Sequence, residues 1–240
     1  MHHVVVERWS RRSSPLHRRD ARSKLGALLV FLAAVSTTSP DAQMVFGGYG
    51  LLLLAAALAS QLPLRGLIAR AALVLPFSAT FALLTWWAGD PLKALSLAEK
   101  SYLSGLAALL LIATTPMPRL LAALDSLHVP RTLVLVIQFL YRYLFVISEQ
   151  AQHMRLAALS RRGTGSGRRS RAVSAFQAAA GTVGVLFARS WERAEGIYDA
   201  MLARGFRGHF ILAEPERFRA ADAWFLCASA ALCVSIRLAF

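Results

Sequence analysis

Two arginines that stand directly before glycines are the residues of this sequence best suited to chemistry. They occur in Arg161-Arg162-Gly163 and in Ala203-Arg204-Gly205, each after a segment with helical periodicity. A guanidinium group at the edge of an apolar helix face can present its planar fork of donors to carbonyl or carboxylate groups of a partner. The same group can instead satisfy its own helix end, where the helix dipole favours a cation. Both interpretations stay open on these residues alone.

Each arginine continues the apolar stripe of a predicted amphipathic helix. The first helix is predicted from Thr132 to about Arg161, and its second half carries a stripe of Leu140, Leu144, Ile147, Ala151, Met154 and Ala158. The second is predicted to begin near Ala172, after a Gly/Ser/Arg linker from Gly163 to Arg171. Its stripe recurs at steps of four and three and ends before a C-cap glycine; it consists of Phe187, Trp191, Ala194, Tyr198 and Met201.

The composition places these helices in a membrane protein. The chain has 240 residues, of which 56% are hydrophobic and 17% charged, whereas soluble domains carry about 25% charged residues. We therefore predict an all-α polytopic membrane protein of about five transmembrane helices with long amphipathic cytoplasmic helices. The apolar segments that predict the five spans are 25–35, 44–59, 71–88, 103–113 and 223–240.

The basic residues predict which segments lie in the cytoplasm. Seven lie in residues 1–24 and fifteen arginines lie in residues 116–221, while the loop 36–43 has none. Cytoplasmic loops carry an excess of Lys and Arg, so we expect a cytoplasmic N-terminal segment (1–24), a four-helix membrane bundle (25–115), a cytoplasmic domain (116–221) and a C-terminal span (222–240). The net charge of +14 follows this topology and does not indicate a nucleic-acid partner.

Residue patterns for catalysis, nucleotides and metals are missing from the sequence. No G-x-x-x-x-G-K-[ST] loop occurs, and no His/Cys cluster has the spacing of metal ligands. The predicted spans contain essentially no carboxylate, which argues against an ion-coupled transporter. Cys227 and Cys233, six residues apart in one helix, do not fit a disulfide. We therefore expect a protein that is not an enzyme and has no catalytic residue, cofactor or metal of its own.

Three regions resemble the transmembrane T component of energy-coupling factor transporters, in its cobalt/nickel-type, CbiQ-like branch. The first is the stretch Ser14-Pro15-Leu16-His17 followed by Asp20-Ala21-Arg22-Ser23-Lys24. The second comprises Thr114-Thr-Pro116, Leu127-His-Val-Pro130-Arg131 and Tyr141-Arg142-Tyr143. The third is the pair of Arg-Gly helix ends, which are similar to the family's paired Ala-Arg-Gly coupling motifs, with Arg161 in place of the first alanine.

The resemblance implies a multi-pass protein of the cell (inner) membrane that works as a non-catalytic subunit of an ABC-type importer. Its long cytoplasmic helices would be coupling helices. Two ATP-binding subunits would dock on Arg162, Gly163, Ala203, Arg204 and Gly205. Their ATP-driven motion would pass to a membrane S component that holds the substrate, with cobalt or nickel as cargo. An accessory small membrane protein is a further expected partner.

Two other classes of function remain as alternatives. One is a membrane-anchored interaction or regulatory protein whose basic region binds anionic lipid. The other is a secondary permease that transports without ATP.

Overall fold

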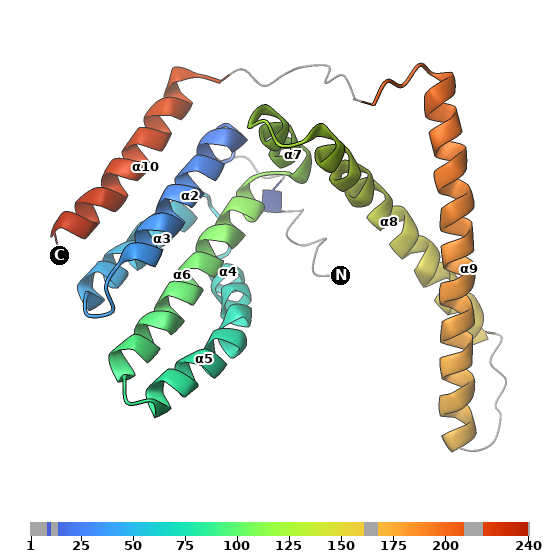
Figure 1. Ribbon diagram of the computed structural model, residues 1–240, viewed down its shortest axis with the longest axis horizontal. Helices are drawn as coiled ribbons and strands as arrows, with labels where there is room; N and C mark the ends of the chain where they lie inside the picture. Colours follow the sequence, from blue (N-terminus) through green and yellow to red (C-terminus); the bar gives the residue numbers. More distant parts are fainter. Residues whose placement is uncertain (1–8, 11–13, 161–167, 209–217, 240) are drawn as a thin grey trace. The chain divides into compact units, whose positions relative to one another are not determined.

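The protein is built of helices, as the sequence predicts. The computed structural model describes residues 9–10, 14–160, 168–208 and 218–239, and no β-strand forms within them. The helices are α2 (Ala21–Thr37), α3 (Gln43–Ala59), α4 (Leu64–Ala71), the 3₁₀ turn η1 (Ala72–Val74), α5 (Leu75–Trp87), α6 (Pro91–Thr114), α7 (Met117–Ser126), α8 (Arg131–Ser160), α9 (Arg168–Ala203) and α10 (Ala220–Ala239) (Figure 1).

Among the described residues, four helical stretches are long and apolar enough to cross a membrane. They are Leu64–Trp87, which combines α4, η1 and α5, and the helices α6, α8 and α10. Helix α3 is apolar but has 17 residues, as has α2, which contains the predicted span 25–35. Both fall short of the about 20 residues that an untilted crossing needs. The prediction of a helical membrane protein with several spans is confirmed.

One predicted loop is mostly helical. We expected residues 61–70 to form a loop between the second and third spans, but α4 begins at Leu64 because Leu67 and Ala71 are fully buried on its inner face. The stretch then tightens into η1 directly before Pro76, the second residue of α5. Proline cannot donate to an α-helical ladder, which fits the break in the α-helical ladder at η1.

The chain divides into two compact units. Unit 1 comprises residues Met1–Leu127 together with Glu214–Phe240, and unit 2 comprises His128–Ala213. Unit 2 contains α8 and α9, which pack against each other. The predicted boundaries after residues 24, 115 and 221 describe sides of a membrane, a property that compactness does not test, so they stay predictions.

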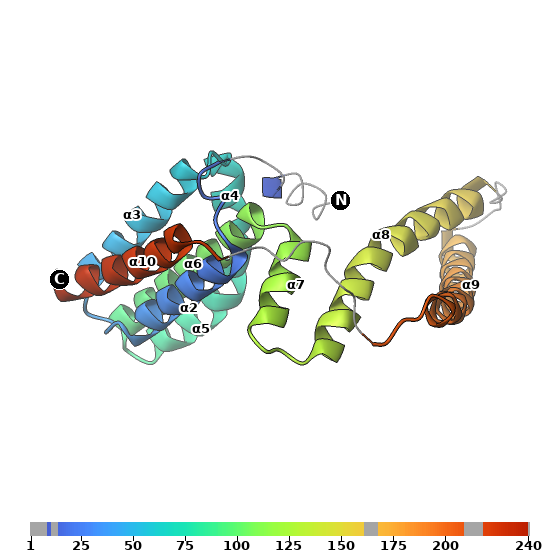
Figure 2. The ribbon, with the colours of Figure 1, turned by 90° about the horizontal axis from the view of Figure 1, so that it is seen from above.

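The core of unit 1 forms around α6. This helix packs against α2, α3, α4 and α5, and α10 lies beside α2 (Figure 2). Tyr49 of α3 is fully buried, and its ring meets Phe31 of α2 edge to face with centroids 5.6 Å apart. Helices α3 and α10 approach closely at Gly48, where a Cβ atom would lie 2.8 Å from a methyl group of Ile236. Among the described helices, the core of unit 1 is therefore shared by α2, α3, α6 and α10.

A single buried carboxylate joins the N-terminal ends of α2 and α10. One oxygen of Asp222 accepts from the amide of Asp20 at 3.2 Å, and the other accepts from the amide of Arg219 at 3.2 Å. The Asp222 amide also donates to the Arg219 carbonyl at 2.8 Å, so both the side chain and the backbone of Asp222 bond the residue that precedes α10. Asp20 in turn caps α2 by accepting from the Arg22 amide at 2.8 Å.

The polar residues of the N-terminal motif form buried hydrogen bonds that hold the start of α2 in place. The buried ammonium of Lys24 donates to the carbonyl of Thr114 and to the hydroxyl of Thr115, both at 3.1 Å, so it ties the start of α2 to the end of α6. The buried His17 ring hydrogen-bonds the Ser14 hydroxyl at 2.7 Å and the Trp9 carbonyl at 3.1 Å. A buried charge is costly unless hydrogen bonds compensate it, and these contacts supply them.

Cations satisfy the C-terminal end of α2. Lys100 of α6 donates to the carbonyls of Ser36 and Thr38, at 3.1 and 2.7 Å, and Arg237 of α10 donates to the Thr37 hydroxyl at 2.7 Å. Positive groups are favoured at a helix C-terminus because the last carbonyls lack intrahelical partners. Both ends of α2 are therefore held by side chains from other helices.

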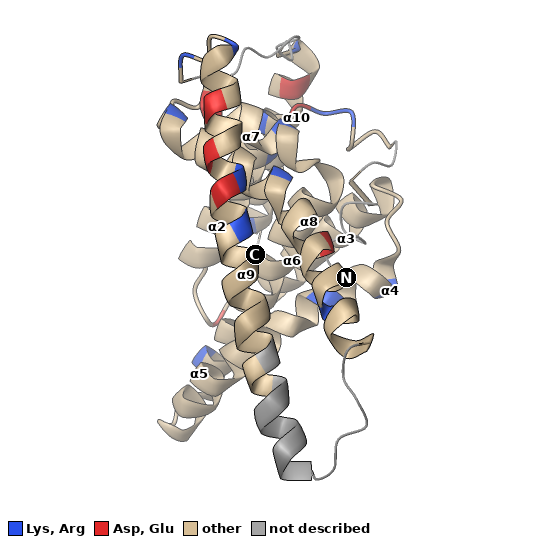
Figure 3. Cartoon of the chain, turned by 90° about the vertical axis from the view of Figure 1, so that its right-hand side faces the viewer, with Lys and Arg blue, Asp and Glu red and all other residues tan. Residues whose placement is uncertain are grey.

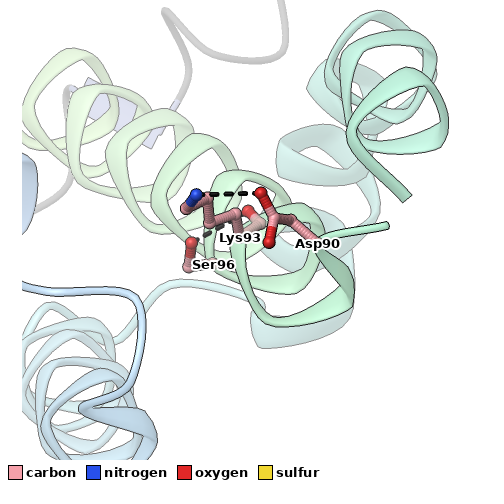
Figure 4. Close-up of polar contacts among 3 residues, drawn as sticks. All are labelled: Asp90, Lys93 and Ser96. Carbon is pink, nitrogen blue, oxygen red and sulfur yellow. Dashed lines mark hydrogen bonds and ion pairs between the residues drawn. The ribbon is translucent and has the colours of Figure 1, made fainter. Parts of the chain in front are cut away.

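The start of α6 carries an exposed ion pair. Asp90 precedes Pro91 and pairs with Lys93 at 2.8 Å, while the Ser96 hydroxyl donates to the Lys93 carbonyl at 2.9 Å (Figure 4). Both charged side chains are more than half exposed, and exposed pairs add little to stability. Pro91 itself fits the first turn, where its missing N–H group is not needed.

Replacing Asp222 tests the helix junction. Asp222→Ala leaves the buried Asp20 amide and the partly buried Arg219 amide without acceptors and is expected to lower the free energy of unfolding by about 3 kcal/mol, measured by titrating the protein in mild detergent with a denaturing detergent. Asp222→Asn, which keeps one acceptor oxygen, should fall in between, and Asp125→Asn, an exposed carboxylate of α7, is the control. A loss below about 1 kcal/mol in Asp222→Ala would contradict the assignment.

Replacing Tyr49 tests the core. The Tyr49 hydroxyl is buried and has no hydrogen-bond partner among the described residues. Removing an unsatisfied buried hydroxyl relieves its desolvation, so Tyr49→Phe is expected to leave the free energy of unfolding unchanged or to raise it by about 1 kcal/mol. The same titration checks this, with Tyr102→Phe at a half-buried position as the control; clear destabilisation by Tyr49→Phe would show that the hydroxyl has a partner.

Candidate functional site

The C-terminal end of α9 has the geometry of a Schellman cap. The Phe206 amide donates to the Met201 carbonyl at 3.0 Å, and the Gly205 amide donates to the Leu202 carbonyl at 2.9 Å. Gly205 has a φ angle of +76°, a left-handed conformation that glycine adopts without a Cβ penalty. The predicted glycine cap is confirmed. It leaves Arg204 exposed as the last residue before the chain turns.

Arg204 lies at a groove between α8 and α9. The groove has a volume of about 800 Å³ and is lined by Phe139, Arg142 and Tyr143 of α8 and by Ile197, Ala200, Met201, Arg204, Gly205, Phe206 and Arg207. Three of these residues are arginines and none is acidic. The aromatic rings of Phe139 and Tyr143 are stacked, with centroids 6.3 Å apart, and the Arg142 guanidinium lies 5.9 Å from the Tyr143 ring centroid.

This arrangement suits a partner with carboxylate or carbonyl acceptors. The arginines supply donors in a fixed fork, and the aromatic and apolar lining accepts a side chain beside them. The sequence does not predict that Arg142 and Tyr143 lie near Arg204, because they are 61 or more positions apart in the chain. The signal that could have found them is the Tyr141-Arg142-Tyr143 motif, where a charge interrupts an apolar run.

The predicted apolar stripe of α9 is largely exposed. Phe187, Trp191 and Tyr198 are 69, 61 and 55% exposed, while Met201 is half-buried in the groove. Helix α8 packs against a different face of α9, next to the stripe. On that face Leu186, Ser190 and Ile197 are half-buried. The stripe thus remains a surface within unit 2.

The first Arg-Gly end cannot be compared with the second. Arg162 and Gly163 lie outside the described residues. Their helix, α8, spans Arg131–Ser160, in agreement with the predicted 132–161. Helix α9 begins at Arg168, four residues before the predicted start, so part of the predicted linker is helical.

A second groove follows the same two helices toward the start of α9. It has a volume of about 940 Å³ and its lining includes Glu149, His153, Arg189 and Arg193. His153 lies 3.8 Å from Glu149, and both side chains are about three-quarters exposed. In the part of the chain that the structure describes, no three His, Cys, Asp or Glu residues come together as metal ligands.

Three relatives share parts of this chain. Nickel permease LarQ of Lactiplantibacillus plantarum is 30% identical over 162 residues, which cover 67% of this chain and 56% of LarQ. An uncharacterized protein of Methanocaldococcus jannaschii is 34% identical over 107 residues, 44% of this chain and 38% of that protein. CbiMQ of Methanocorpusculum labreanum, named as a fused cobalt transport protein, is 30% identical over 103 residues, 43% of this chain and 16% of CbiMQ.

The match to a protein family extends further along the chain than these alignments. The alignments span less than two thirds of each relative's own length. The model of the family CbiQ, cobalt transport protein, matches residues 12–213, a range that contains the N-terminal motif, α8, α9 and the groove around Arg204. The chain therefore belongs to the CbiQ cobalt transport protein family.

Proposed function

We propose that this protein is the energy-coupling membrane subunit of an ATP-driven importer for cobalt or nickel. In this role it binds two ATPase subunits through its Arg-Gly helix ends and passes their motion to a membrane subunit that holds the substrate. The observation that carries the proposal is the exposed Arg204, presented by a rigid helix cap beside two further arginines. Family membership supports a transport role.

The electrostatics of the groove support a protein partner with acceptor groups. Arg142, Arg204 and Arg207 line one groove with no acidic residue among its lining. Such a site attracts carboxylates and binds them bidentately. Apolar and aromatic residues beside the arginines add packing area, and Arg and aromatic side chains dominate binding energy at protein interfaces.

The proposed cargo rests on the names of the family and the relatives. The family is named for cobalt transport and LarQ is named a nickel permease. Because the described residues offer no cluster of metal ligands, we place the cargo site on the partner membrane subunit. ATP hydrolysis is likewise placed on the partners, since the sequence has no phosphate-binding loop.

Replacing Arg204 tests the docking role. Arg204→Ala is expected to weaken capture of the ATPase subunit by about tenfold to a hundredfold, the range for losing charged hydrogen bonds, and to reduce metal uptake while membrane insertion stays normal. Arg193→Ala, an exposed arginine of α9 that lines the other groove, is the matched control. Copurification from membranes and cellular metal uptake are the measurements.

Three experimental outcomes would contradict the proposal. Normal capture and uptake in the double variant Arg162→Ala/Arg204→Ala would remove the docking role. Metal transport by this protein alone in liposomes, without ATP, would identify a permease. Binding to anionic vesicles that follows total basic charge, with no special loss at the two helix ends, would identify a lipid-binding protein.

Replacing Gly205 tests whether the cap presents Arg204. A β-branched residue is strained at a φ angle of +76° by about 1–3 kcal/mol. Gly205→Val is therefore expected to fray the last turn and to weaken ATPase capture with Arg204 still present. Gly196→Ala, where an added Cβ meets nothing within 4 Å, should leave capture unchanged; equal capture by both variants would show that the cap is not needed.

A further inference from the structure

Helix α9 carries a row of three carboxylates. Glu192, Glu195 and Asp199 are its only acidic residues, and their spacing of three and four places them on one side of the helix. All three are exposed. In Figure 3 the acidic positions of α9 gather in its C-terminal half. We call Glu192, Glu195 and Asp199 the acidic row.

The acidic row is unfavourable in this chain by itself. Like charges three and four residues apart repel each other on a helix, and carboxylates near a C-terminal end oppose the helix dipole. Within the described residues no ion pair offsets the row: Glu195 accepts a hydrogen bond from the indole of Trp191 at 2.9 Å, and neither Glu192 nor Asp199 has a cationic partner. Departures from local stability rules are expected at functional surfaces.

An exposed apolar stripe lies directly beside the acidic row. Phe187, Trp191 and Tyr198 lie on one face, more than half exposed. With 100° between successive residues, the carboxylates border this stripe on one side and Arg193 lies on its other side, while Arg189 lies nearly opposite the stripe, one turn before Glu192; both arginines line the groove with α8. The Trp191–Glu195 bond joins stripe and row into one surface.

We propose that this surface binds a protein segment that carries apolar side chains and a parallel row of Lys or Arg, such as a basic amphipathic helix. The negative charge of the surface favours a basic protein segment over anionic lipid. Anionic lipid headgroups would be repelled by three exposed carboxylates, while basic side chains would neutralise them and let the apolar residues pack. The proposal goes beyond the proposed function because it needs neither Arg204 nor an ATPase.

A designed peptide probes the surface. We would measure, by fluorescence anisotropy, binding of a labelled Leu/Lys amphipathic helix of about 18 residues, or five turns, to the full-length protein in neutral detergent. The triple variant Glu192→Gln/Glu195→Gln/Asp199→Asn is expected to bind at least tenfold more weakly, about 1.4 kcal/mol. Its thermal unfolding midpoint should rise, because the repulsion is gone. A Leu/Glu helix of the same pattern is the matched probe and should not depend on the row.

A charge-matched variant separates the row from general electrostatics. Asp41→Asn/Asp125→Asn/Glu149→Gln removes three exposed carboxylates from other elements and is expected to bind the Leu/Lys helix as the native protein does. Equal weakening in the two triple variants, or unchanged binding in the first, would overturn the proposal. So would tighter binding of the first variant to phosphatidylglycerol vesicles with no loss of peptide binding, which would assign the surface to lipid.

The same measurement separates this proposal from the docking role of Arg204. Arg204→Ala should bind the Leu/Lys helix normally, whatever happens to ATPase capture. Loss of peptide binding in Arg204→Ala would place the contact in the arginine groove and overturn the proposal. The single variant Glu195→Gln, which removes one charge, should show a smaller loss than the triple variant.

Discussion

The backbone groups at helix ends are the constraint on which the rest of this structure depends. The first and last turns of a helix leave backbone N–H and C=O groups without intrahelical partners, and in unit 1 side chains from other helices bond several of them. Helix α2 shows the solution at both ends: Asp222 accepts from its N-terminal side, and Lys100 and Arg237 donate to its C-terminal side. The same contacts decide which helices are neighbours, because each joins elements that are distant in the chain.

The two helices of unit 2, in contrast, bury few side chains. Among its described side chains, Val134 is the one buried residue, so α8 and α9 hold each other through a narrow contact and keep most of their apolar area exposed. Elements with few buried contacts open and shift easily. Such a pair suits a role in which partners determine its working arrangement, and its exposed stripe and grooves provide the contacts.

Much of this was predictable because it depends on local pattern. Apolar periodicity predicted α8 within one residue at each end, and the glycine after Arg204 predicted the cap that ends α9. What the sequence could not provide was pairing across the chain. The interactions of Asp222 with Asp20 and of Lys24 with Thr114 join residues 202 and 90 positions apart. Helix α4 was missed because two buried residues, not composition, decide it.

The junction at Asp222 has a consequence for how the protein is made. Residues before and after unit 2 form one bundle, so α2 emerges from the ribosome long before the carboxylate that completes its N-terminal cap. At typical synthesis rates of about 5–20 residues per second, the Asp20 amide waits on the order of ten seconds or more for its partner. Throughout that interval the nascent bundle is open on the side that α10 will fill. Closure by the last helix is thus a late assembly event, at which insertion machinery or a chaperone could still act on the chain.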